Sequence, residues 1–590
     1  MASSIVASAR SACEQYVEWA PDDWSRREAK DMLDRGDETL LVARFGKRIA
    51  FGTAGLRAVM GAGTAAMNPL VILQTCQGLC QYGQEAIPNF KSRGVVIGFD
   101  GRHHSREFAD LAAFVFMSQG VTVHLMRKMI PTPFVPFGVV QLRTAIGVMV
   151  TASHNPKQDN GFKVYWSNGA QIVPPHDSNI AAAIDNNLRP WMEYRGFTLD
   201  HQALAANDPT ERLWTSYFQT ISAPPYCNVS GDFPTPIKVT YTAMHGVGTA
   251  AVLAAFQSFR LPPPIQVAEQ CTPDPEFSTV KYPNPEEGAG ALALAMKAAE
   301  SAGSRLILAN DPDADRLAVA ERTCDGNWRI FNGNEIAALF ADWLWTCYLE
   351  RNPKCDRSKA FMVASCVSSR YLEAMAAHEG FLFQDTLTGF KWLGNAIIDM
   401  EARDLTFLFA YEVEIGFLTG NMSYDKDGVR MAAVFAELAN SLYRQHSTCT
   451  SRLEELYKKY GYFSMKASYF FCESRSVMDR IFDRLRAGDY RPHSSTSVKS
   501  VRDVTRGLDS SQPDGRSRLP AMPNDQMLTF AFADGTLVTL RNSGTEPKLK
   551  YYVECRDSSR AASDAKLAVM ARYVIDEFIQ PTVHGLAAPK

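Results

Sequence analysis

Residues 94–125 read GVVIGFDGRHHSREFADLAAFVFMSQGVTVHL, a stretch that alternates apolar runs with a helical period. An apolar run at 95–97 is followed by apolar residues at the spacing of one helix face over 108–115, and then by a second apolar run at 121–125. A further apolar run follows at 145–150. Strand and helix alternating in this way are typical of a doubly wound α/β domain.

The same alternation continues beyond a proline-rich break at 224–236. A new strand is expected at 237–241, and an acidic loop separates two buried strands at 305–308 and 317–320. A third block begins with a helical stretch at 334–349. Three α/β blocks in succession are therefore predicted.

The last part of the chain has a different pattern. Residues 493–518 are polar and serine-rich, which indicates an exposed loop, and alternating runs at 527–532 and 536–540 flank Asp534 and Gly535 as in a β-hairpin. With a helix over 561–578, this part is expected to be an α+β domain. The predicted domains, arranged around a central cleft, are 1–232, 233–333, 334–462 and 463–590.

The bulk composition places the chain among globular enzymes. Its 590 residues exceed one hydrophobic core, and 46% hydrophobic with 21% charged residues excludes a disordered or fibrous protein. A net charge of -3 provides no overall positive electrostatic field that would attract nucleic acid. Twelve scattered cysteines without a Cys-x-x-Cys pair, no signal pattern and no run of 18 apolar residues lead us to expect a cytoplasmic protein without membrane partners.

The run Thr151-Ala152-Ser153-His154-Asn155-Pro156 follows an apolar strand and offers a serine hydroxyl with no evident triad. Because ligands bind beyond the carboxyl ends of strands in α/β sheets, Ser153 is a candidate nucleophile. His154 could act as its general base, as in a hydrolase, or as a donor that orients a phosphate. The Gly-x-Ser-x-Gly elbow of α/β hydrolases is absent, which disfavours the hydrolase.

Residues 311–316 read DPDADR and place three carboxylates two positions apart after a strand. Alternate residues of a tight loop can turn toward one point, and such oxygen ligands with open positions suit Mg²⁺. An acidic surface turn is the simpler alternative. An EF-hand calcium loop fits less well, because its glycine and terminal glutamate are missing.

Residues 541–548 read RNSGTEPK, and their backbone, hydroxyl groups and cations could wrap a phosphate; a polar turn is the alternative. Four other segments are weaker signals on their own. The segment 51–57 is an anion loop or a flexible turn, 98–102 could bring Arg102 toward the same cleft, and 389–392 with 411–416 could meet sugar hydroxyls. Together these motifs point to one phosphorylated substrate that bridges domains.

With the motifs in this order, the chain resembles the α-D-phosphohexomutase superfamily over about residues 45 to 580, and within it the eukaryotic phosphoglucomutase 2 group, which includes phosphopentomutase. The resemblance rests on the Ser-His-Asn-Pro, triple-Asp-Arg and Arg-Asn-Ser-Gly-Thr-Glu-Pro motifs. It implies that Ser153 carries a phosphoryl group and that an oxygen of this group on Ser153 binds Mg²⁺ together with Asp311, Asp313 and Asp315. A sugar monophosphate would accept this group and become a bisphosphate. The bisphosphate would then reverse its orientation in the site and return its other phosphate to the enzyme.

The resemblance also implies roles for further residues. Arg57 and Lys163 would lie near the reacting phosphoryl group, with Lys163 a candidate proton shuttle, and His154 would orient the phosphate. The residues implied to bind the substrate are Arg316 after the metal loop, Gly389 and Lys391 in the loop that distinguishes the two sugar orientations, Glu412 at the sugar hydroxyls, and Arg541, Ser543, Gly544, Thr545 and Lys550 at the distal phosphate.

The implied activity is that of an isomerase of carbohydrate metabolism, a Mg²⁺-dependent phosphopentomutase with phosphoglucomutase activity, activated by a sugar 1,6- or 1,5-bisphosphate. Many glucomutases read Gly-Glu-Glu-Ser-Phe-Gly where this chain reads YEVEIG at 411–416, so their hexose specificity is not carried over. The phosphoglucomutase 2 group also departs from that pattern, and this resemblance implies pentose 1-phosphates as substrates, with glucose 1-phosphate as a second substrate. A glucose 1,6-bisphosphate synthase, a phosphosugar-binding protein without turnover, and a phosphatase that uses the Asp loop are the alternatives. We expect the protein to bind sugar phosphates only. We also expect it to be a monomer or a weak dimer.

Overall fold

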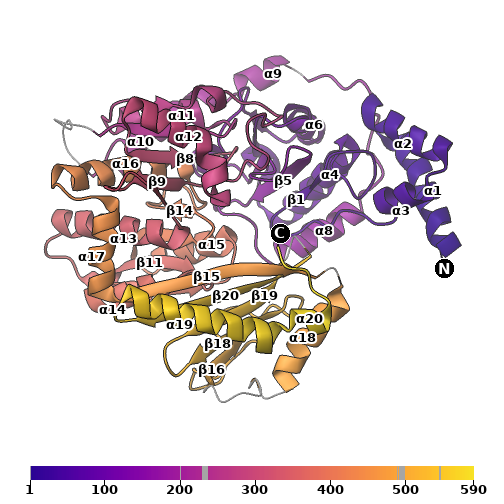
Figure 1. Ribbon diagram of the computed structural model, residues 1–590. Helices are drawn as coiled ribbons and strands as arrows, with labels where there is room; N and C mark the ends of the chain where they lie inside the picture. The colour runs from indigo at the N-terminus through magenta and orange to yellow at the C-terminus, as the bar shows by residue number, and fades with distance from the viewer. Residues whose placement is uncertain are drawn as a thin grey trace. The chain divides into compact units, whose positions relative to one another are not determined.

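The computed structural model describes residues 2–199, 201–228, 237–472, 474–487, 490, 498–543 and 547–589 (Figure 1). The chain forms two compact units. The first unit comprises Met1–Cys355 with Gly389–Cys449, and the second comprises Asp356–Thr388 with Thr450–Lys590.

The first unit begins with three helices. These are α1 (Ala2–Trp19), α2 (Asp23–Arg35) and α3 (Glu38–Phe45). Asp22 and Asp37 cap the starts of α2 and α3 by accepting backbone N–H groups. The apolar faces of the helices form a small core of their own, to which Ala62 and Leu70 contribute.

The first sheet has the strand order β1-β5-β4-β2-β3. Its strands are β1 (Leu56–Val59), β2 (Val95–Phe99), β3 (Val123–Leu125), β4 (Ile146–Val150) and β5 (Asp159–Tyr165). Strand β2 pairs in parallel with β3 and β4, whereas β5 runs antiparallel to β4 and β1 antiparallel to β5. All residues of β2 and β4 are buried, as expected for a sheet covered by helices.

The helices that accompany this sheet include α4 (Pro69–Ala86), α5 (Phe90–Arg93), α6 (Ser105–Ser118), α7 (Phe134–Leu142), α8 (His176–Asp185) and α9 (His201–Ala206). Helix α6 packs on β2 and β3, α7 packs on β2 and β4, and α4 packs on α6 and α8. Apolar residues of the sheet and of α4, α5, α6, α8 and α9 form one continuous core that reaches from Leu56 to Leu204.

The second sheet repeats this arrangement, with the order β10-β9-β8-β6-β7. Its strands are β6 (Val239–Thr242), β7 (Ile265–Gln266), β8 (Leu306–Ala309), β9 (Ala318–Arg322) and β10 (Trp328–Phe331), accompanied by α10 (Thr210–Ile221), α11 (Gly248–Ser258) and α12 (Ala289–Ala302). Strand β6 is parallel to β7 and β8, and β9 is antiparallel to β8. Strands β6, β7, β8 and β9 therefore correspond to β2, β3, β4 and β5.

A third group of elements completes the first unit. Its members are α13 (Gly333–Arg351), α15 (Phe390–Glu401), β13 (Thr406–Glu412), β14 (Gly416–Leu418) and α16 (Gly428–Arg444). Strands β13 and β14 form an antiparallel pair, so this group contains the same kind of hairpin as β4 with β5 and β8 with β9.

The second unit contains a parallel strand pair and an antiparallel sheet. Strands β11 (Ala360–Ser365) and β12 (Leu382–Thr386) pair in parallel around α14 (Tyr371–Glu379). The six-stranded sheet has the order β15-β20-β19-β18-β16-β17. Its strands are β15 (Tyr462–Phe471), β16 (Val498–Asp503), β17 (Leu508–Asp509), β18 (Met527–Phe532), β19 (Leu537–Asn542) and β20 (Lys548–Asp557). The helices of this part are α17 (Cys449–Tyr460), α18 (Arg475–Ala487) and α19 (Arg560–Tyr573). Helix α17 begins at the last residue of the first unit. Helix α19 packs on β15 and β20.

The predicted fold class is confirmed, with α/β domains followed by a C-terminal domain built on an antiparallel sheet. The sheets of the first unit are mixed, because each adds antiparallel strands to its parallel core. The predicted loop at 493–518 is wrong in part: β16 and β17 lie within it, and Val498 and Val501 pack on the core. Residues 493–497 lie outside the described residues. The four domain limits stay a prediction.

Candidate active site

Three loops of the first unit occupy equivalent places in the fold. Each follows a buried strand and leads into its antiparallel neighbour: 151–158 between β4 and β5, 310–317 between β8 and β9, and 413–415 between β13 and β14. These loops lie beyond the carboxyl ends of strands, where α/β sheets bind ligands.

The first loop presents Ser153, which is 2% exposed. Its φ of 54° lies in the left-handed region that non-glycine residues rarely adopt. The hydroxyl donates to Asp311 Oδ2 at 2.8 Å, and Oγ lies 3.2 Å from His154 Nδ1. The structure thus brings the serine of the first loop into contact with the acidic loop of the next sheet.

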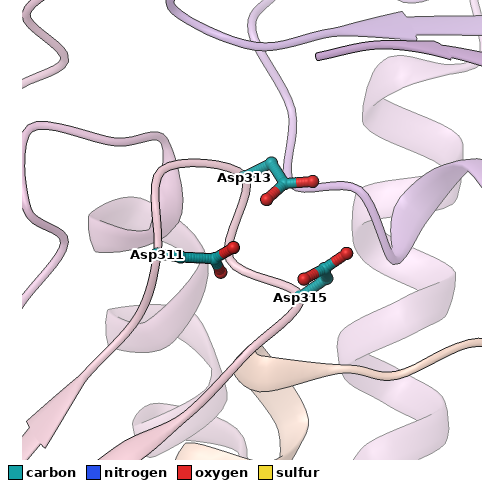
Figure 2. Close-up of side chains that lie close together, drawn as sticks. All are labelled: Asp311, Asp313 and Asp315. Atoms are coloured by element: carbon teal, nitrogen blue, oxygen red, sulfur yellow. The ribbon is translucent and has the colours of Figure 1, made fainter. Parts of the chain in front are cut away.

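The second loop carries three fully buried carboxylates, Asp311, Asp313 and Asp315. Figure 2 shows the three side chains converging, and one oxygen of each lies within 4.8 Å of the others. Ala314 turns the loop with a φ of 55°. Within the described ranges, these residues are the single group of three or more acidic, histidine or cysteine side chains that could hold a metal ion.

The hydrogen bonds of these carboxylates leave room for a cation. Oδ2 of Asp313 accepts from Lys163 Nζ at 2.7 Å and from Thr132 Oγ1 at 2.5 Å, and Oδ2 of Asp315 accepts from Lys163 Nζ at 2.9 Å. The Oδ1 atoms of Asp313 and Asp315 have no hydrogen-bond partner among the described residues. Buried carboxylate oxygens without a donor are costly, and a hard divalent cation satisfies them.

The acidic loop also perturbs the ionisation of its own members. Burial, followed by the charges of Asp313 and Asp315, raises the pKa of Asp311 well above its ordinary value. Burial alone would lower the pKa of Lys163, but Asp313 and Asp315 raise it. Lys163 is therefore held as a buried ammonium that offsets part of the negative charge.

Two further groups face the serine. Arg57 donates from Nη1 to Asn155 Oδ1 at 3.0 Å, and burial together with the charge of Arg316 lowers its pKa. Burial, followed by the charges of Arg316 and Arg57, lowers the pKa of His154 well below its ordinary value. The imidazole beside Ser153 is therefore neutral at physiological pH.

Arg316 ends the acidic loop and is held at two points. Its backbone N–H donates to Asp311 Oδ1 at 3.0 Å, and its Nη1 donates to Glu286 Oε2 at 2.9 Å. Burial alone would lower its pKa, but Glu286 and Asp311 raise it. Arg316 thus supplies a fixed positive charge beside the carboxylates.

The third loop and its surroundings bring together the residues predicted to meet the sugar. Glu412 Oε1 accepts from the Gly389 backbone N–H at 2.6 Å, and the Lys391 ammonium donates to Thr53 Oγ1. Burial, followed by the charge of Glu414, raises the pKa of Glu412 to about 7. These contacts connect the 51–57 segment with Lys391, and the neighbouring Gly389 with Glu412 at the end of β13, an association that sequence spacing did not indicate.

Three residues of the site were missed by sequence reasoning. Lys426 Nζ lies 2.9 Å from Asp315 Oδ2 and 3.6 Å from Asp425 Oδ1, while Thr132 bonds Asp313. Asp425 is buried and accepts from Tyr165 Oη and Gln171 Nε2, both at 2.8 Å. The run Asp425-Lys426-Asp427-Gly428 at the start of α16 is the signal that could have revealed Lys426. For Thr132 the sequence offers none.

The predicted distal phosphate residues lie in the second unit. Arg541 on β19 stands opposite Lys550 on β20, and its Nη2 donates to Tyr552 Oη at 3.1 Å. The Ser543 N–H donates to the Lys548 carbonyl at 2.9 Å. The two cations therefore share one face of the hairpin. Gly544 and Thr545 lie outside the described residues.

Comparison with known proteins identifies the family. Four models match in succession, namely phosphoglucomutase/phosphomannomutase α/β/α domain I at 48–190, domain II at 215–326, domain III at 332–460, and the C-terminal domain at 497–570. The chain is 43% identical to a phosphopentomutase of Homo sapiens, covering 97% of this chain and 96% of that protein. It is 42% identical to a glucose 1,6-bisphosphate synthase of Homo sapiens, covering 98% and 95%.

Solved structures agree at the level of the fold. A phosphoglucomutase/phosphomannomutase family protein of Burkholderia thailandensis superimposes with a TM-score of 0.64 at 18% identity, covering 90% of this chain and 98% of that one. Among the described residues, no helix is long and apolar enough to cross a membrane. Because four domain models match in succession and the relatives align over nearly their full length, the chain belongs to the α-D-phosphohexomutase superfamily.

Proposed function

We propose that this protein is a Mg²⁺-dependent phosphopentomutase that also acts on glucose phosphates. The observation that carries the proposal is the contact between Ser153 Oγ and the buried carboxylates of the 311–315 loop. An isolated serine hydroxyl is a weak nucleophile, but a serine phosphate at this place would lie beside a divalent cation site and a buried lysine. That setting suits phosphoryl transfer, in which position and charge neutralisation contribute more than a strong base.

The proposed reaction has two balanced halves. In the first, the bond between phosphorus and Ser153 Oγ breaks and a bond from phosphorus to a sugar hydroxyl oxygen forms. The proton of that hydroxyl passes in net terms to Ser153 Oγ, which becomes a free hydroxyl. The sugar bisphosphate then reverses its orientation in the site. Its other phosphoryl group moves to Ser153 Oγ, and the proton transfer runs in the reverse direction. One serine thus serves both halves, and a sugar 1,6- or 1,5-bisphosphate primes the enzyme.

Mg²⁺, when bound by Asp311, Asp313 and Asp315, supplies charge neutralisation at the transferring phosphoryl group. We assign Arg57, Arg316 and the neutral His154 to orienting its oxygens. Lys163 stays protonated beside Asp313 and Asp315, so it adds positive charge near the transferring phosphoryl group. We also assign it the role of proton shuttle that the family resemblance implies. Lys426, beside Asp315, joins this set as a further cation.

The substrate residues follow from the third loop and the second unit. We propose that Glu412 accepts hydrogen bonds from sugar hydroxyls, that Gly389 and Lys391 help to distinguish the two sugar orientations, and that Arg541, Ser543, Gly544, Thr545 and Lys550 hold the distal phosphate. Support for pentose specificity comes from Glu414 at a position where many glucomutases carry serine, and from the phosphopentomutase relatives.

Coupled assays with ribose 1-phosphate and glucose 1-phosphate, each primed by the matching bisphosphate, test the proposal. We expect turnover of both, with the larger kcat/KM for the pentose. Net formation of glucose 1,6-bisphosphate from glucose 1-phosphate, with 1,3-bisphosphoglycerate as the phosphoryl donor, at a rate above that of either mutase reaction would instead make the protein a bisphosphate synthase. No turnover, with no phosphate on Ser153 by mass spectrometry, would leave a sugar-phosphate-binding protein.

A further inference from the structure

The loop that carries Ser153 is held from behind by one buried arginine. Arg102 is 4% exposed and lies just after β2, in the segment that follows the strand next to β4. Its Nη1 donates to the carbonyls of Pro156 at 2.8 Å and Asp159 at 3.1 Å. Its Nη2 donates to the carbonyls of Ser153 at 2.5 Å and Asn155 at 2.6 Å.

These four bonds use both terminal nitrogens of the guanidinium. Because the group is planar and its N–H directions are fixed, carbonyls that bond to it are fixed in direction as well. A lysine ammonium in this place could not reach four carbonyls spread over 153–159. The arginine therefore fixes the backbone path of the loop and does not merely supply a positive charge beside it.

Asp100 completes the arrangement on the other side. It is 2% exposed, accepts from Thr151 Oγ1 at 2.6 Å, and faces Arg102 Nε at 3.4 Å. Thr151 Oγ1 in turn accepts from the Ser153 N–H at 2.9 Å. Both backbone polar groups of Ser153 are thus tied to the Asp100-Gly101-Arg102 segment, and this residue is the one with the left-handed φ of 54°. A disfavoured backbone conformation persists only where its surroundings hold it.

We infer that Arg102 is a positioning residue for phosphoryl transfer, which keeps Ser153 Oγ at one place beside Asp311 whether the oxygen is a hydroxyl or a phosphate ester. The inference rests on the proposed function. A single carrier oxygen that gives and takes a phosphoryl group needs the same geometry in both halves, and a displacement of about 1 Å costs on the order of 100-fold in rate.

The Arg102→Lys variant tests this role. We expect kcat to fall by about 10- to 100-fold while KM for the sugar phosphate stays within about threefold, because the altered step is transfer and not binding. Hydrogen exchange of the amides in 151–159 should become faster in the same variant. Arg106→Lys is the matched control, since Arg106 pairs with Asp110 at 2.8 Å and should leave both readouts unchanged.

Chemical rescue gives a second readout. Arg102, His104 and Arg106 line a pocket of about 600 Å³ that is open to solvent, so the space left by truncation in Arg102→Ala can be reached by added guanidinium. We expect millimolar guanidinium to restore part of the kcat of Arg102→Ala and none of that lost by Ser153→Ala. If Arg102→Ala does not fold, the Lys variant decides.

Wild-type kcat in Arg102→Lys, or a lower kcat with unchanged exchange of the loop and no rescue, would overturn the inference. Failure of the proposed function looks different. In that case the wild-type protein turns over neither pentose nor hexose phosphates, while loop exchange in Arg102→Lys still reports whether Arg102 holds the loop.

Discussion

The Ser153 loop and the Asp311–Asp315 loop occupy the same place in two sheets of the same strand order, yet they carry different chemistry. Each joins the central parallel strand to its antiparallel neighbour, and each turns through a non-glycine residue of positive φ, Ser153 in one and Ala314 in the other. The first loop supplies one hydroxyl, and the second supplies three carboxylates. The fold therefore provides a rigid place at a strand end, and the side chains alone decide what it does.

The two loops also depend on each other. The Ser153 hydroxyl donates to Asp311, and Lys163, on the strand after the serine loop, bonds Asp313 and Asp315. Neither loop is a complete site without the other. Variants that remove the chemistry of one loop and spare the other separate their contributions.

The largest effect is expected from Ser153→Ala, which empties the first loop and leaves the carboxylates in place. Loss of the proposed phosphoryl carrier should lower kcat by about 10⁴-fold or more, in line with the removal of other nucleophiles. The affinity of the unphosphorylated variant for Mg²⁺, measured by calorimetry, should stay near that of the unphosphorylated wild type. Ser178→Ala, which removes an exposed hydroxyl, is the control. Full turnover in Ser153→Ala would favour a phosphatase that uses the Asp loop.

Asp313→Asn makes the converse change, because it weakens the second loop and leaves the serine. It removes one charge from the cation site and one partner of Lys163, so we expect activity to fall by about 100-fold and Mg²⁺ to bind more weakly. Titration of activity with Mg²⁺ checks both. The exposed Asp325→Asn variant should match the wild type. Unchanged Mg²⁺ dependence in Asp313→Asn would contradict the assignment of the site.

Thr132→Val is expected to have an intermediate effect that sharpens the comparison. Its hydroxyl, from the segment before α7, donates to Asp313 Oδ2 at 2.5 Å, so the serine-loop domain helps to orient a carboxylate of the other loop. Loss of such an outer partner should weaken Mg²⁺ binding by about 10-fold, with kcat recovered at saturating Mg²⁺. Thr220→Val, whose hydroxyl bonds a carbonyl within α10, is the control. A loss of kcat that excess Mg²⁺ does not restore would be evidence against this role.

The parts of this site that could be predicted from the sequence are the local ones. The triple-Asp motif and the buried strands before each loop lie within short windows, where spacing and apolar runs carry the signal. Thr132 and Asp313 are 181 positions apart, and only the packing of two domains brings them together. Lys426 likewise depends on the placement of α16. Strand β16 was missed because its partly buried valines lie within a polar run.

The smallest effect is expected at the third hairpin, where Glu412 lies close to Glu414 and Lys426 offsets only part of their repulsion. Glu412 has an ordinary pKa of 4.5, which burial and Glu414 raise to about 7 in the folded protein. Between these values the folded state binds more protons than the unfolded state, so the free energy of unfolding should fall as pH rises through this window. Glu412→Gln should flatten that dependence.

Urea denaturation between about pH 4.5 and pH 7.5 measures the slope, and the difference should be on the order of 1 kcal/mol, because the side chain is only partly buried. Glu414→Gln removes the neighbouring charge. It should narrow the pH range over which the free energy of unfolding falls, without abolishing this dependence. An unchanged slope in Glu412→Gln would show that the proton resides elsewhere. A flattened slope would mean that Glu412 holds this proton, whereas the charge of Asp315 is balanced by Lys163 and Lys426.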